Sequence, residues 1–192
     1  MAKREPGERR KEILQTLAHM LEEPKGQKIT TALLAAKLDV SEVALYRHFA
    51  SKAQMFEGLI EFIEETVFSL VNKIQAEETQ GIKQVEGIVA MLLSFAQKNQ
   101  GMTRVLIGDA LVNEDDRLQA RMNQLHDRLE ASLRQSARLA ATDGALHSSL
   151  DANAYANAVM SFIVGRWHQF AKSGYKRSPT EHLAQSWSVF AG

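Results

Sequence analysis

Apolar residues recur every three or four positions along most of the chain, which is the period of an amphipathic α-helix. This pattern predicts an all-α protein with long helices over residues 8–23, 51–76, 85–97, 113–140 and 151–172. A short helix and a corner are expected over residues 102–111, and Ser178-Pro179 is expected to open a last helix. Polar connections at residues 77–82 and 142–150 separate the long helices.

Two further short helices, joined by a tight turn, are predicted between the first two long ones. Thr30 or Thr31 is the expected N-cap of the first short helix, which Asp39 ends. Ser41 is the expected N-cap of the second, which should extend to Phe49. This order is typical of a helix-turn-helix, whose second helix enters a DNA major groove.

The second short helix carries two different faces. Leu45 and Phe49 are four residues apart and share one face, which should point inward. The opposite face has a methyl-bearing residue, a phenol and a guanidinium, which suit contacts to thymine, bases and phosphates. The predicted DNA-binding residues are Thr30, Thr31, Ser41, Val43, Ala44, Tyr46, Arg47, His48 and Lys52. A solvated helix that happens to be basic is the alternative.

Charge supports a nucleic-acid partner only for the N-terminal part. The formal net charge of the 192 residues is zero, but residues 1–52 hold ten Lys and Arg against seven Asp and Glu. Residues 1–7 read as a basic disordered tail that includes Lys3, Arg4 and Pro6, and Pro24 to Gly26 should end the first helix. The chain lacks cysteine and an apolar leader, so a cytoplasmic, nucleoid-associated protein is expected.

The sequence lacks the patterns that carry catalysis. It contains no nucleophile elbow, phosphate-binding loop or dinucleotide fingerprint. Its six histidines never stand four apart, and each is expected to be a surface or capping residue. We therefore predict a protein that is not an enzyme and that uses no metal and no cofactor.

The run LAAKLDVSEVALYRHFASKAQMFEGLIEFI resembles the N-terminal domain of the TetR family of helical DNA-binding regulators. The resemblance implies a three-helix head over residues 1–52, linked by the helix 51–76 to a helical dimerisation and partner-binding domain over residues 53–192. It also implies that Tyr46, His48 and Lys52 hold phosphates. Ala50 replaces the family's usual proline, which predicts a less rigid corner.

The helices predicted over residues 113–140 and 151–172 are expected to form a dimer interface with their copies in a second subunit. The first carries a coiled-coil-like seam, and the second carries a row of small residues that would let a neighbouring helix approach closely. The predicted interface residues are Leu118, Met122, Leu125, Leu129, Ala154, Ala158, Ser161, Phe162 and Gly165. Two heads related by a two-fold axis would read a palindromic site in double-stranded DNA.

Residues 29–65, 98–111, 114–125 and 166–183 together resemble a group within the family, the bacterial nucleoid occlusion factors. That resemblance implies a DNA-bound homodimer that blocks septum assembly over the chromosome by binding the tubulin-like protein FtsZ, with no membrane contact. It places the FtsZ-binding groove at Phe62, Leu70, Met91, Ser94, Lys98 and Asn99. Leu70 and Lys98 depart from the group, which has arginine at both positions, and so weaken the transfer for an acidic partner.

The sequence leaves two points open. Phe62 and Phe68 lie at and beyond the edge of the apolar stripe, so they are either partly exposed or covered by a neighbouring helix, and cover is preferred for Phe62. The alternatives to a division inhibitor are a ligand-responsive transcriptional repressor, which would contain a buried and partly polar cavity, and a helical interaction module that binds no DNA.

Overall fold

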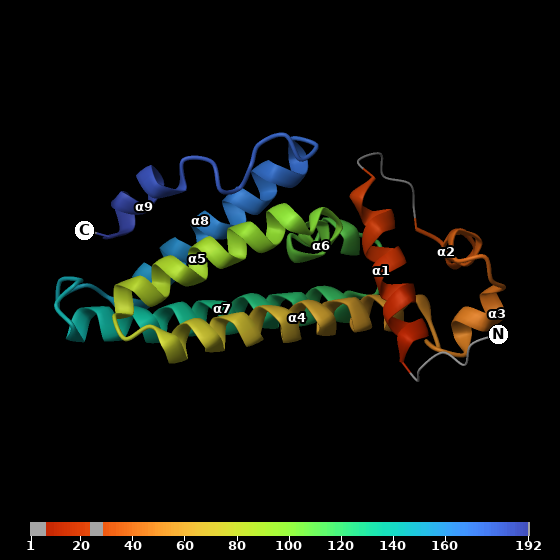
Figure 1. The fold of residues 1–192 in the computed structure, drawn as a ribbon, viewed down its shortest axis with the longest axis horizontal. Coiled ribbons are helices and arrows are strands. Elements are labelled where there is room, and N and C mark those ends of the chain that lie inside the picture. Colours follow the sequence, from red (N-terminus) through yellow and green to blue (C-terminus); the bar gives the residue numbers. More distant parts are fainter. Residues whose placement is uncertain (1–6, 24–28, 192) are drawn as a thin grey trace.

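The structure is a computed structural model that describes residues 7–23 and 29–191, and within these residues the secondary structure is helical (Figure 1). The α-helices are α1 (Glu8–Glu22), α2 (Thr31–Lys37), α3 (Glu42–Tyr46), α4 (Lys52–Glu77), α5 (Gly81–Lys98), α6 (Gln100–Leu106), α7 (Asp116–Thr142), α8 (Ala152–Lys172) and α9 (Leu183–Ala191). A short 3-10 helix, η1 (Asp109–Leu111), follows α6. The all-α prediction is confirmed. The expected N-terminal tail, except Gly7, and the expected helix end at Pro24 to Gly26 lie outside the described residues.

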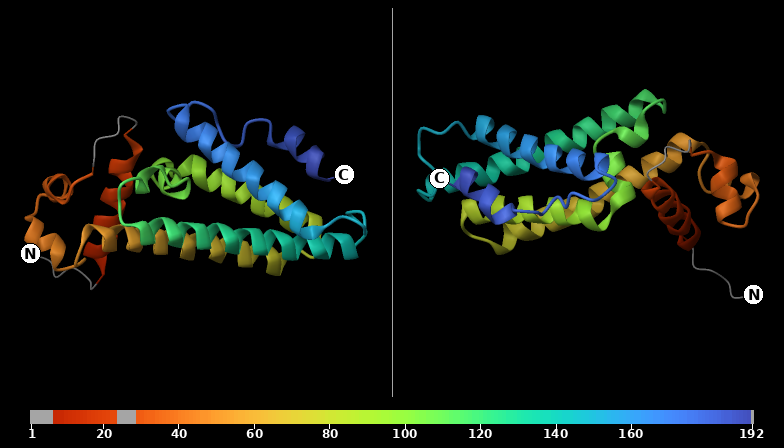
Figure 2. Two further views of the ribbon diagram at one scale, coloured as in Figure 1. Left: turned by 180° about the vertical axis from the view of Figure 1, so that it is seen from behind. Right: turned by 90° about the horizontal axis from the view of Figure 1, so that it is seen from above.

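The molecule is elongated, with α1, α2 and α3 gathered at one end and α5 to α9 at the other (Figures 1 and 2). Helix α4 extends from the first group along the second, beside α7. We call α1 to α3 the head and α5 to α9 the body. Both ends therefore share one long helix, and the head reaches the body through α4 and through contacts of α1 with α6.

The helix caps in the head agree with the sequence. The Thr30 hydroxyl oxygen accepts a hydrogen bond from the Leu33 amide at 3.2 Å, and the Ser41 hydroxyl oxygen accepts one from the Ala44 amide at 3.2 Å. Asp39 has a φ of 53°, which ends the right-handed helix before the turn. Helix α3 ends at Tyr46, three residues before the expected end, yet Phe49 still packs inward because the chain turns there toward α4.

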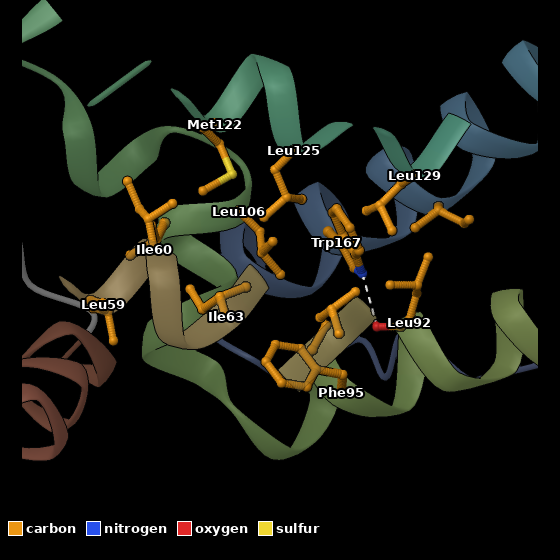
Figure 3. Packing of buried hydrophobic residues seen from close by; sticks show 14 of the residues in the cluster. Leu59, Ile60, Ile63, Leu92, Phe95, Leu106, Met122, Leu125, Leu129 and Trp167 are labelled. Carbon is orange, nitrogen blue, oxygen red and sulfur yellow. Dashed lines mark hydrogen bonds between the residues drawn. The ribbon is translucent and has the colours of Figure 1, made fainter. Parts of the chain in front are cut away.

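The core of the body forms around Trp167 of α8. Its side chain is fully buried among apolar residues of α4, α5 and α7 (Figure 3). Its indole N–H donates to the Leu92 carbonyl of α5 at 3.2 Å. A buried indole N–H needs an acceptor, and this bond to a second lone pair of a helix carbonyl satisfies it and connects α8 with α5.

His126 departs from the expectation that the histidines are surface or capping residues. It lies on α7 with its ring centroid 5.9 Å from that of Trp167, and its Nε2 is buried with no hydrogen-bond partner among the described residues. Burial lowers the pKa of His126 below its usual value, although a hydrogen bond to the Leu106 backbone opposes this. His126 is therefore a half-buried residue packed beside Trp167.

The last helix begins at Leu183, later than the expected start at Ser178-Pro179. The segment before it, residues 179–182, is made of turns, in which the Glu181 amide donates to the Ser178 carbonyl at 3.2 Å. Arg166 of α8 holds this segment, because its guanidinium donates to the carbonyls of Pro179 at 3.0 Å and Ser178 at 3.3 Å. It also donates to the Glu181 carbonyl.

Head and body approach most closely where α1 crosses α6. A Cβ atom added to Gly101 would lie 1.9 Å from the Ala18 carbonyl oxygen of α1. One turn further along α6, Arg104 donates to the Leu21 carbonyl at 3.2 Å and is held by Asp109 at 2.9 Å. The guanidinium thus satisfies carbonyls at the C-terminal end of α1, where the helix itself offers no donor.

We expect Gly101→Ala to lower the free energy of unfolding by about 2 kcal/mol or more, because the new methyl group overlaps backbone that cannot shift without moving α1. Urea unfolding followed by circular dichroism measures the change. Gly87→Ala is the matched control, since its methyl would meet only the flexible Ile74 side chain, at 3.2 Å. Equal stability of the two variants would contradict the close crossing of α1 and α6.

Candidate DNA interface and partner surface

Helix α3 presents the face that the sequence predicts. Leu45 and Phe49 are each 1% exposed and fill the interior of the head. On the other side, Val43 is 66% exposed and Tyr46 is 44% exposed. A valine and a tyrosine left in solvent on the same short helix have no packing role in the chain, so this face is available for a partner.

Hydroxyl and carboxylate groups connect α3 with the start of α2. The Thr31 hydroxyl donates to the Glu42 carboxylate at 2.5 Å, and the Tyr46 hydroxyl donates to the Thr31 oxygen at 3.4 Å. This exposed chain holds the phenol beside the N-terminal end of α2. Backbone N–H groups and the positive end of a helix dipole favour an anion there, and in the single chain the Glu42 carboxylate lies at this end through its bond with Thr31. The exposed hydroxyl groups of Tyr46 and Thr30 are of the kind that contact a DNA backbone.

Arg10 of α1 fixes the C-terminal end of α3. Its guanidinium donates to the His48 carbonyl at 2.9 Å and lies 4.2 Å from the centroid of the Phe49 ring. At the following corner, the Ala50 amide donates to the Gln54 side chain at 2.8 Å. A proline has no such N–H, so the corner has here a hydrogen bond that the family's usual residue cannot make.

The predicted DNA-binding residues line one end of the molecule, but they differ in exposure. Arg47, His48, Thr30 and Ser41 are exposed, while Thr31 and Ala44 are half-buried. Lys52 is also half-buried, and its ammonium is paired with the Glu114 carboxylate from the connection between η1 and α7. Lys52, which was predicted to hold a phosphate, therefore already has an anionic partner within the chain.

The predicted FtsZ-binding residues lie on α4 and α5 and at the start of α6. Phe62 is 46% exposed and Leu70 is 38% exposed, so the cover preferred for Phe62 is absent in the chain. Phe62 and Met102 line a small cavity of about 60 Å³. Lys98 is exposed, whereas Met91, Ser94 and Asn99 are half-buried.

Two neighbours of this surface have internal roles. The Asn99 side-chain amide donates to the Phe95 carbonyl in the last turn of α5 at 2.7 Å. This amide, which was predicted to bind FtsZ, therefore already has a partner within the chain. Phe68, the other open case, is half-buried because the Arg128 guanidinium of α7 lies 3.9 Å from the centroid of its ring. A helix of the body therefore covers Phe68 but not Phe62.

The predicted dimer residues divide into two sets. The seam residues Leu118, Met122, Leu125 and Leu129 are each 0% exposed within the single chain, so their assignment to a subunit interface is wrong. They pack into the body's own core with α4 and α8 (Figure 3). The small residues of α8 behave differently, because Ala154, Ala158, Ser161 and Gly165 are exposed and Phe162 is half-buried.

The described residues contain no group of three histidines, aspartates or glutamates placed to hold a metal ion. A cavity of about 290 Å³ lies between α5 and α9, lined on one side by Val89 and on the other by Leu183 and Trp187. None of the described helices is both long enough and apolar enough to cross a membrane.

Comparison with known proteins decides the family. Residues 20–59 match the model for bacterial regulatory proteins of the tetR family, and residues 79–192 match the SlmA-like model for the tetracyclin repressor-like C-terminal domain. The nucleoid occlusion factor SlmA of Idiomarina loihiensis is 50% identical over 94% of this chain and 92% of its own length. The same-named protein of Alteromonas mediterranea is 50% identical over 95% and 93%. The chain belongs to the SlmA family of nucleoid occlusion factors.

Solved structures of TetR-family regulators share the fold of this SlmA-family chain. The fatty acid degradation regulator FadR from Bacillus halodurans superposes with a TM-score of 0.81 over 98% of this chain and 97% of its own, at 15% identity. The structure of AibR in complex with isovaleryl coenzyme A and operator DNA superposes with a TM-score of 0.69 over 90% of this chain and 99% of its own, at 13% identity. The printed names of these relatives are those of a nucleoid occlusion factor and of regulators.

The sequence missed the residues that hold the interface in place. Arg10, Glu114 and Arg104 each contact an element far away in the chain, and the apolar period carries no information about such polar pairs. The only sequence signal that includes Arg10 is the excess of Lys and Arg over Asp and Glu in residues 1–52.

We expect Tyr46→Ala to weaken binding to a specific duplex by about 1–3 kcal/mol, because the variant loses the hydroxyl that would contact a phosphate and the aromatic ring that carries this hydroxyl. Fluorescence anisotropy measures the affinity, with a duplex that the parent protein selects from a random pool. Tyr46→Phe is the matched variant that removes the hydroxyl alone. Thr30→Ala is a poorer probe, since the hydroxyl also caps α2. Affinity within about 0.5 kcal/mol of the parent for Tyr46→Ala would mean that this face does not contact DNA.

Proposed function

We propose that the protein is a sequence-specific DNA-binding homodimer that, when bound to DNA, inhibits division-septum assembly over the chromosome by binding FtsZ. The observation that carries the proposal is the exposure of Phe62 and Leu70 on α4, a helix whose other large apolar residues are mostly buried. The names of relatives 50% identical over nearly the whole chain support the same role. The proposed place of action is the nucleoid, in the cytoplasm.

The proposed division of labour follows the chain. Residues 1–52 would bind DNA, and residues 53–192 would form the dimer and bind the partner, with α4 joining the two. Phe62 supports this because its surface continues toward the head, where Arg10 and Lys11 of α1 and Glu61 and Glu65 of α4 border a shallow cavity of about 250 Å³. The exposed aromatic ring suits an apolar residue of a short peptide, and Lys98 on α5 and Lys11 on α1 are the cations that an acidic residue of it would meet, whereas Glu61 and Glu65 would repel one.

The proposed dimer interface is the outer surface that α7 and α8 form together. Its centre is the exposed row that includes Ala158 and Gly165, and nothing within 4 Å would meet a methyl group added to Gly165 in the single chain. A glycine inside a helix costs about 1 kcal/mol relative to alanine, so a glycine without a neighbour in its own chain is explained by a close neighbour in another. Beside this row, the Asn157 amide donates to Glu130 of α7 at 3.2 Å, which keeps the two helices in one surface.

We expect Ala158→Arg to convert the dimer to a monomer at micromolar concentration, because a long charged side chain in a closely packed helix pair cannot be accommodated or solvated. Sedimentation velocity measures the mass. Ala76→Arg, on the exposed side of α4, is the matched control and should leave the mass unchanged. A parent chain that is itself monomeric at micromolar concentration and binds DNA at full affinity would contradict the proposal.

We expect the parent protein with a specific duplex to reduce the amount of FtsZ polymer that pellets, and Phe62→Ala to lose this effect while it still binds DNA. The loss would follow from removing the largest exposed apolar group on α4. Val189→Ala, which shortens an 80% exposed side chain on α9, is the matched control. Polymer that is unchanged by the parent with and without duplex would exclude the division role and leave a DNA-binding regulator of another kind.

A further inference from the structure

An ion pair joins the head-proximal end of α4 to the body. Lys52 is the first residue of α4, and Glu114 lies between η1 and α7, so the two residues are 62 positions apart in the chain. The Lys52 side chain is 23% exposed and the Glu114 side chain is 16% exposed. This pair is more shielded from solvent than ordinary surface ion pairs, which lose most of their strength to screening.

The backbone around Glu114 directs its carboxylate toward the head. The Glu114 amide donates to the Leu111 carbonyl at 3.0 Å, and Asn113 takes the left-handed conformation, with a φ of 65°. Immediately afterwards, the Asp115 side chain accepts from the Arg117 amide at 3.1 Å and starts α7. Glu114 is thus held on both sides by short, local hydrogen bonds and does not depend on a long mobile loop.

The same end of α4 favours an anion for a second reason. A lysine at the first position of a helix lies against the positive end of the helix dipole, where a cation is unfavourable and a carboxylate or a phosphate is favourable. The Glu114 carboxylate compensates both the ammonium and the dipole. Lys52 also lies 5.6 Å from the centroid of the buried Phe56 ring, which keeps the ammonium at this corner.

We propose that Glu114 is a built-in competitor for DNA phosphate at Lys52, an autoinhibitory contact that lowers the affinity of each head for DNA. The proposal rests on the proposed function in one respect, namely that Lys52 holds a phosphate in the complex. A phosphate that approaches Lys52 must either displace the Glu114 carboxylate or accept its repulsion at the same ammonium. Both routes subtract from the affinity of the complex.

The contact also couples DNA binding to the body. Because Glu114 belongs to the connection that starts α7, a phosphate that takes over Lys52 removes a link between the start of α4 and the body. The contacts of Gly101 with Ala18 and of Arg104 with the end of α1 lie on another element, α6, and are not affected. DNA phosphate and the Glu114 carboxylate are therefore alternatives at the Lys52 ammonium.

The test compares the parent with Glu114→Gln by fluorescence anisotropy on the selected duplex. Glutamine keeps the size of the side chain and removes its charge, so we expect the DNA affinity of the dimer to rise about three- to tenfold. Asp116→Asn is the matched control, since it removes the same charge two residues away, in the first turn of α7, without a contact to Lys52. Asp116→Asn should change the affinity less than twofold.

A double-mutant cycle with Lys52→Gln separates this proposal from the proposed function. If Lys52 holds phosphate, Lys52→Gln weakens DNA binding, and Glu114→Gln then has no further effect in its presence. If Lys52→Gln leaves the DNA affinity unchanged, Lys52 does not hold a phosphate. If Lys52→Gln lowers the DNA affinity but Glu114→Gln leaves it unchanged, Glu114 does not compete with phosphate. An equal rise in DNA affinity with Asp116→Asn would overturn the competition in the same way. Urea unfolding checks that each variant is folded, and Glu114→Asp, which withdraws the carboxylate by one methylene, should give a smaller rise if Glu114→Gln does not fold.

Discussion

The burial of one continuous apolar face of α4 holds the two ends of this molecule together. Phe56 and Leu59 in the first half of that face, and Val67 and Val71 in the second half, belong to one hydrophobic cluster that also contains buried residues of α1, α3 and the body. No flexible linker separates head and body, because a single run of helix hydrogen bonds passes along α4. The position of the head is therefore determined by the packing of the body.

The second attachment of the head makes that position specific. One helix alone would let the head pivot, but α1 also crosses α6 with a glycine at the point of contact and an arginine on its last carbonyls. Asp109 anchors this arginine and also accepts from Lys172 at the end of α8. Burial alone would raise the pKa of Asp109, yet these two cations lower it, so the carboxylate stays charged. The chain of contacts connects the helix proposed for dimerisation with the helix that supports α3.

In α7 and α8, hydrophobic periodicity identified which residues are buried, but it did not identify the helices that cover them. The seam of Leu118 and Leu125 has the spacing of a subunit interface, and it packs inside the chain because α4 and α8 reach it first. Apolar residues have the same spacing of three and four whether the helix that covers them belongs to the same chain or to a second subunit. The row around Ala158 had the weaker apolar signal and is the one left exposed.

The sequence by itself determined the helices of the head, their caps at Thr30 and Ser41, and the opposed faces of α3, since these depend on residues within one or two turns of each other. It also carried the family resemblance. Only the tertiary structure decided that Phe62 is uncovered, that the Nε2 atom of His126 is buried and that Glu114 meets Lys52. Those outcomes depend on which distant helices meet. Their meeting is set by the sum of many small packing energies, which no local pattern contains.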